Sequence, residues 1–153
     1  MGLSTQLATF RRWMFARHCS PWSAWTRWAS TPLVLVPVWT RRPRDAALVA
    51  AWLAANPVIF PKPPNDRAWA TRAILGEELS VTGRKRDSAK GLTAATSLVG
   101  FVAIIAAARH RLTFTVVACA MQMALTLVYW EKMARYWDRF GISAAASASS
   151  TGS

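Results

Sequence analysis

Six ionisable side chains have the types that acid–base chemistry on a phosphate ester needs. A histidine is the usual general base, a carboxylate can act as the acid or orient the base, and arginines hold phosphate oxygens through paired N–H donors. The residues of these types are His18, Asp66, Glu77 and Glu78, with Arg27 and Arg72. Such a cluster could act on a lipid phosphate. In the alternative interpretation, these side chains only cap helices and pair charges.

Other reactive patterns are missing from the sequence. His18 and Cys19 are adjacent and His110 is remote, so they supply no metal ligand set at usable spacing. We find no glycine-rich phosphate loop, nucleophile elbow or His-Glu zinc motif. The seven acidic residues all lie outside the long apolar runs, whereas a proton-coupled transporter needs a carboxylate within its bundle. The sequence therefore predicts no metal and no cofactor, assigns no catalytic residue, and leaves open whether the protein is an enzyme.

Two apolar runs in the second half must position these side chains relative to a membrane. Residues 91–108 and 112–130 contain no Asp, Glu, Lys, Arg or His, and each is close to the length that crosses a bilayer as a helix. Three residues connect them, which predicts a tight antiparallel hairpin. Helical spacing continues to residue 140, with a favourable Glu131–Arg135 pair. We expect Gly141 to end the helix and 141–153 to form a disordered tail.

The first half is less regular. Apolar stretches over 22–40 and 46–60 flank three arginines, and Pro32 and Pro37 should bend the first stretch. We expect residues 22–60 to span the membrane twice as tilted or kinked helices, with a re-entrant or interfacial hairpin as the alternative. Residues 61–90 then form a loop with a short amphipathic helix over 65–79. The predicted fold is an all-α integral membrane bundle, with four transmembrane helices in two hairpins (22–60 and 91–140) and an interfacial helix.

The charge balance points to an acidic partner. Nineteen Lys and Arg residues against seven Asp and Glu give a net charge of +12, while 53% of the residues are hydrophobic. Nucleic acid or anionic lipid would satisfy this charge, and the long apolar runs favour lipid over nucleic acid. The basic residues divide 14 to 5 between the two sides, which places both termini and the central loop in the cytoplasm. Residues 1–21, rich in aromatic and basic side chains, are expected to lie at the interface.

Three stretches carry a family resemblance: His18–Arg27 (HCSPWSAWTR), Asn56–Pro63 (NPVIFPKP) and Trp69–Glu77 (WATRAILGE). Together they resemble a family of small bacterial and archaeal integral membrane proteins of unknown function, over about residues 15–140. This chain has Ser20 where the family motif has Asn. The predicted spans and charge distribution indicate a multi-pass protein of the inner membrane, and the resemblance implies a membrane protein whose activity is unassigned. It nominates a binding cluster near the cytoplasmic face: His18, Trp22, Arg27, Asn56, Arg72 and Glu77.

Binding is the function that these observations favour. The expected partner is anionic lipid, a larger membrane protein or a second copy of the chain, and nucleic acid is not expected. The alternative function is an enzyme at the membrane interface that acts on a lipid phosphate head group through the cytoplasmic cluster.

Overall fold

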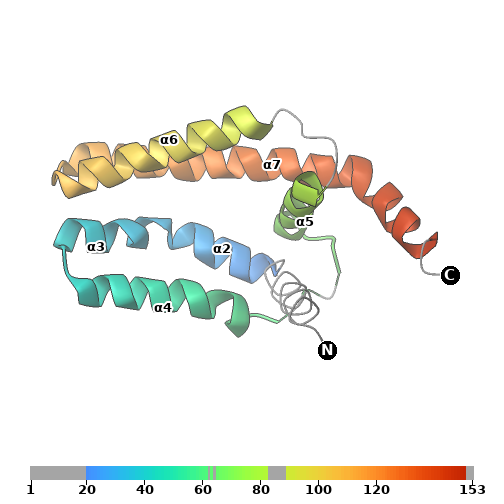
Figure 1. Ribbon diagram of the computed structural model, residues 1–153, viewed down its shortest axis with the longest axis horizontal. Helices are drawn as coiled ribbons and strands as arrows, with labels where there is room; N and C mark the ends of the chain where they lie inside the picture. The colour runs from blue at the N-terminus through green and yellow to red at the C-terminus, as the bar shows by residue number, and fades with distance from the viewer. Residues whose placement is uncertain (1–19, 62, 64, 83–88, 151–153) are drawn as a thin grey trace, which may run out of the picture.

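The computed structural model describes residues 20–61, 63, 65–82 and 89–150, and every regular element among them is helical. Two helical hairpins lie side by side, and one shorter helix, α5, crosses one end of the bundle (Figure 1). The connection within each hairpin lies at the opposite end of the molecule from α5 (Figure 1). The all-α fold predicted from the sequence is confirmed.

The first hairpin has a segmented arm and a continuous arm. The first arm consists of α2 (Pro21–Ala29), the 3-10 turn η1 (Thr31–Val34) and α3 (Leu35–Thr40), and the second is α4 (Pro43–Ile59). Pro32 is the second residue of η1, so the break in the α-helix lies at the first of the two prolines expected to bend this arm. α3 ends at Thr40, and the next residue, Arg41, has a left-handed φ of 54°. α4 continues through Asn56–Pro57 to Ile59, although a proline disfavours the helical conformation of the residue before it.

The second hairpin pairs α6 (Ala89–Ala108) with α7 (Leu112–Ser150) through a turn at His110, where φ is 53°. A Cβ on Gly100 would lie 2.8 Å from Nε2 of Gln122, so the missing side chain lets α6 approach α7 closely. α7 runs through Gly141 to Ser150 instead of ending at Gly141. Gly141 has no positive φ, and the alanine-rich sequence beyond it favours helix.

Helix α5 (Trp69–Thr82) packs across α7, and these two helices supply six of the seven residues of the hydrophobic core cluster. Ala70, Ala73 and Ile74 of α5 meet Met133 and its neighbours on α7. Gly76 lies directly against the backbone carbonyl of Met133, where no side chain would fit. This core cluster therefore lies at the α5 end of the bundle, while small residues of α6 such as Ala103 and Ala107 are buried elsewhere.

The other surfaces of α6 and α7 are apolar and exposed. Two segments are long and apolar enough to cross a membrane, Gly91–Ala108 and Leu112–Gly141, and only 22% and 17% of their respective 18-residue apolar windows are buried. Phe101 and Phe114, for example, are 62% and 65% exposed. A core helix of a soluble protein buries its large apolar side chains, whereas a membrane helix presents them to lipid. The two helices thus indicate association with a membrane.

Candidate functional site

A cluster of tryptophans joins α2, α5 and α7 at the end of the bundle where α5 lies. The rings of Trp25 and Trp69 stack at 5.7 Å between centroids, and Trp130 meets both edge-on at 5.9 Å. Trp28 adds an edge-on contact with Trp25 and donates its indole N–H to the carbonyl of Met123 at 3.1 Å. Aromatic pairs at these distances and angles stabilise beyond their buried area. The cluster therefore fixes three elements relative to one another.

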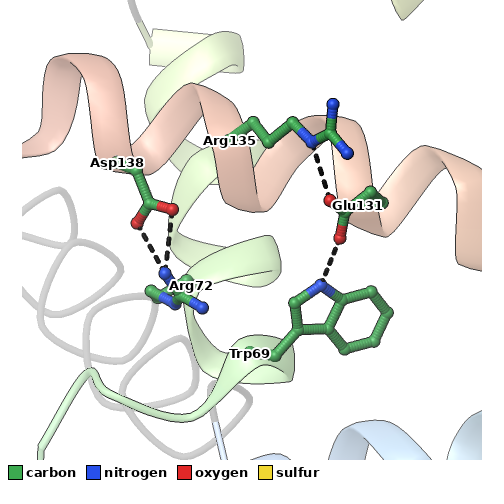
Figure 2. Close-up of polar contacts among 5 residues, drawn as sticks. All are labelled: Trp69, Arg72, Glu131, Arg135 and Asp138. Carbon is green, nitrogen blue, oxygen red and sulfur yellow. Dashed lines mark hydrogen bonds and ion pairs between the residues drawn. The ribbon is translucent and has the colours of Figure 1, made fainter.

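Polar contacts between α5 and α7 flank the tryptophans (Figure 2). The indole N–H of Trp69 donates to Glu131 at 2.7 Å, and Arg135 donates to the other carboxylate oxygen of Glu131 at 2.7 Å. The predicted Glu131–Arg135 pair is thus confirmed. One turn further along α5, Arg72 Nη1 lies 2.8 and 2.9 Å from the two carboxylate oxygens of Asp138 on α7. These contacts align α5 with the part of α7 beyond Trp130.

Glu77 is a half-buried carboxylate on α5. It accepts a hydrogen bond from Tyr129 and feels the positive charge of Arg27. Burial raises the pKa of Glu77, and the Tyr129 hydrogen bond and the Arg27 charge oppose this shift only in part. Residues from α2, α5 and α7 thus meet around one carboxyl group that holds its proton more firmly than a free glutamate.

Asn56 lies in a different environment, fully buried between the arms of the first hairpin. Its Oδ1 accepts a hydrogen bond from the Ser23 hydroxyl at 2.9 Å, and its Nδ2 donates to the Thr26 hydroxyl at 2.7 Å. On the next turns, Trp52 donates to the Ser30 hydroxyl at 2.8 Å. Because polar groups in an apolar setting need partners, this network holds α2 against α4.

The residues that the family resemblance nominates as a binding cluster thus lie in several different environments. Arg27 lies near Glu77, whereas Arg72 pairs with Asp138 and Asn56 is enclosed within the first hairpin. Trp22 is 70% exposed on α2, and His18 lies outside the described residues. Among the described residues no group of three His, Cys, Asp or Glu side chains could hold a metal ion.

Sequence reasoning missed the partners that α7 supplies, namely Tyr129, the Trp69 acceptor Glu131, and Asp138. The Arg72–Asp138 pair joins residues 66 positions apart, and no local pattern predicts such a pairing. One signal was available, since Glu131 and Asp138 are seven residues apart and therefore share a helix face. This spacing predicts that the helix face carrying Glu131 and Asp138 packs against a segment with basic or hydrogen-bonding side chains.

The fold defines the class of protein as an all-α chain whose two longest apolar helices suit a membrane. The chain belongs to a family of unknown function, DUF6653, whose model matches residues 9–153. The resemblance to a family of unknown function is thereby confirmed. Comparison with curated proteins and with solved structures finds no match.

Proposed function

We propose that this protein is a multi-pass protein of the bacterial inner membrane that binds anionic phospholipid. The observation that carries the proposal is the outward-facing apolar surface of α6 and α7. In water this surface would be far larger than a soluble monomer normally exposes. Lipid chains would cover it without a penalty, and the net charge of +12 would draw anionic head groups.

The first hairpin supports a four-span arrangement. α3 packs beside α6, so the two hairpins lie at the same depth (Figure 1). Residues 21–40 are helical over almost their full length, and the 17 residues of α4 extend about 26 Å. Leu48 and Ile59 of α4 are 61% and 59% exposed. In this proposal all four arms cross the bilayer, and α5 lies at its cytoplasmic interface.

The orientation follows from charge. Both turns lie at one end of the bundle, and they carry five of the 19 basic residues (Figure 1). The remaining 14 belong in sequence to the segment before the first hairpin, the segment between the hairpins and the chain after Trp130, and by the positive-inside rule these segments would be cytoplasmic. Chemistry on a lipid phosphate is less well supported, because Asp138 engages Arg72, and Ser23 and Thr26 enclose Asn56.

Cysteine accessibility tests the topology. Single cysteines are placed by Asp45→Cys, His110→Cys or Asp66→Cys in a chain that also carries Cys19→Ser and Cys119→Ala. An impermeant maleimide should label the first two positions only from outside the cell and the third only in inverted vesicles. Labelling of Asp45→Cys from the cytoplasmic side would show that the first hairpin does not span the membrane.

Native mass spectrometry of the detergent-solubilised protein tests the binding. We expect phosphatidylglycerol to bind at least about tenfold more tightly than phosphatidylcholine, since each nearby basic residue contributes on the order of 1 kcal/mol of attraction to anionic lipid. Equal binding of the two lipids would refute the proposed preference.

A further inference from the structure

An apolar groove of about 390 Å³ lies between the first arm of hairpin one and α7. From η1 and α3 its lining includes Pro32, Val36 and Trp39, and from α7 it includes Thr115, Cys119 and Met123. Cys119 and Thr115 are buried at its floor, being 6% and 7% exposed. The groove lies outside the tryptophan cluster and the polar network described above.

The lining suits a hydrocarbon chain. Eight of its ten residues are apolar, and the two threonine hydroxyls are already used. Thr115 Oγ1 donates to the carbonyl of Arg111 at 2.9 Å, and Thr40 Oγ1 donates to Asp45 at 2.6 Å. A ligand with many polar groups would lose hydrogen bonds to water on entering this groove, whereas an alkyl chain would lose none.

The length of the groove matches one leaflet of a bilayer. On α7 the lining extends from Thr115 to Met123, and the eight steps between them correspond to about 12 Å along a helix. Half of a hydrocarbon core of about 30 Å is roughly 15 Å. At Met123 the indole of Trp28 crosses to the backbone of α7, and the lining ends at this level.

The lining residues Thr40 and Thr115 lie near the two turns, and the turn regions carry five exposed arginines: Arg41, Arg42, Arg44, Arg109 and Arg111. Within residues 41–45 and 109–111, Asp45 is the one acidic residue. Arg41 Nη2 donates to the carbonyl of Ala108 at 3.0 Å, which holds its guanidinium beside the α6–α7 turn. Arg111 precedes Thr115 by one helical turn, so cationic side chains lie at the level where a lipid phosphate would sit.

Charge also argues against a second copy of the chain as the occupant. A symmetric dimer formed through this groove, with both subunits in the same orientation, would bring two arginine-rich ends together. Like charges placed against each other are unfavourable, and an anionic lipid removes that repulsion.

We propose that the groove holds one acyl chain of an anionic phospholipid, whose phosphate is bound by Arg41, Arg109 and Arg111. The proposal rests on the membrane placement and lipid preference proposed above. It adds one defined site, in the leaflet that faces the two turns, with a stoichiometry of one lipid per chain.

A groove-filling variant tests the site. Ala120 lines the groove and is exposed, so Ala120→Trp fills the space without entering the core. Val117 lies outside the lining on the same helix and is 54% exposed, which makes Val117→Trp the matched control. By native mass spectrometry, wild type and Val117→Trp should retain one phosphatidylglycerol, and Ala120→Trp should bind it at least about tenfold more weakly. The double variant Arg109→Gln/Arg111→Gln should also lose affinity for phosphatidylglycerol.

The outcomes separate this inference from the proposed function. If Ala120→Trp binds phosphatidylglycerol like wild type while the arginine variant does not, lipid binding stands and the acyl-chain site is refuted. If wild type shows no preference for phosphatidylglycerol over phosphatidylcholine, the proposed function itself fails. If wild type retains no lipid and is a dimer that Ala120→Trp dissociates, the groove is an interface between copies and the inference is wrong.

A second measurement needs only the wild-type protein, in case Ala120→Trp is not monodisperse. Phosphatidylglycerols of increasing chain length share one head group, so a site that holds a chain should bind the dilauroyl lipid far more tightly than the dihexanoyl lipid. Equal affinities would show that the head group alone is recognised.

Discussion

The two ends of this bundle use their side chains in opposite ways. At the α5 end, four tryptophans pack together, and Arg72 and Arg135 each contact a carboxylate on α7. At the end formed by the two turns, five exposed arginines accompany one aspartate, and an open apolar groove runs between them and Met123. Among the described residues, several charged and aromatic groups of the first end pair with one another, whereas the second end exposes charge and apolar surface. The comparison teaches that the side-chain contacts between α5 and α7 gather at one end, whereas the groove and the exposed arginines lie toward the other, and we expect substitutions at the two ends to differ in their effect on stability.

The largest effect should come from Gly76→Ala, at the close approach of α5 to α7. The new Cβ would overlap the carbonyl of Met133, and backbone cannot move aside as a side chain can. We expect a loss of about 3 kcal/mol in the free energy of unfolding, measured by denaturation in detergent. Gly91→Ala is the control, because nothing lies within 4 Å of its new Cβ. A neutral Gly76→Ala would mean that α5 does not pack on α7 as described.

Asn56→Ala should have the next largest effect. It removes both hydrogen bonds of a fully buried amide and leaves the Ser23 hydroxyl without its acceptor, which costs about 2 kcal/mol. The measurement is the same denaturation experiment. Asn65→Ala serves as control at an exposed asparagine, and equal effects from the two variants would contradict the buried network.

A smaller effect, on the pH dependence of the free energy of unfolding, is expected from Glu77. Burial raises the pKa of Glu77 in the folded protein, so the folded state binds the proton more tightly than the unfolded chain does. Stability should therefore fall as the pH rises from the ordinary glutamate value of 4.5 through the raised pKa. Glu77→Gln should remove this loss and Glu78→Gln should keep it, as thermal unfolding at a series of pH values would show. An unchanged slope in Glu77→Gln would contradict the assignment.

The smallest effect on stability is expected from Arg72→Gln. The Arg72 and Asp138 side chains are 32% and 48% exposed, and pairs with that exposure contribute about 0.5 kcal/mol. Any difference from wild type should shrink further at high salt, because screening weakens exposed pairs. Arg44→Gln, at the opposite end, should leave stability unchanged. A loss from Arg44→Gln as large as that from Gly76→Ala would remove the contrast between the two ends.

Local sequence signals predicted the elements far better than the contacts between them. Uninterrupted apolar runs were enough to predict α6 and the first half of α7. The amphipathic helix was expected over 65–79 and begins at Trp69, because Asn65 Oδ1 accepts the backbone N–H of Arg67 and orders a turn before the helix. The end of α7 was misplaced because glycine is enriched after helices but does not by itself end one.

The candidate site depended on pairings that sequence alone could not supply. Asn56 was nominated for binding, yet its partners Ser23 and Thr26 lie on the other arm of the same hairpin. The groove is formed by apolar residues that each look like ordinary membrane-helix positions. Four spans, lipid binding and the cytoplasmic orientation remain predictions that the labelling and binding experiments test.

The two turns have an evolutionary consequence. Each contains a non-glycine residue in the left-handed region, Arg41 with φ 54° and His110 with φ 53°. Glycine adopts this conformation freely, whereas other residues pay about 1 kcal/mol for it. A mutation to glycine at either position would therefore relieve the backbone strain while removing a basic or aromatic side chain from the end of the bundle that contains the two turns. Homologues that keep a basic residue at both positions would show selection for charge over backbone relaxation, and glycine at both would show selection for the turn alone.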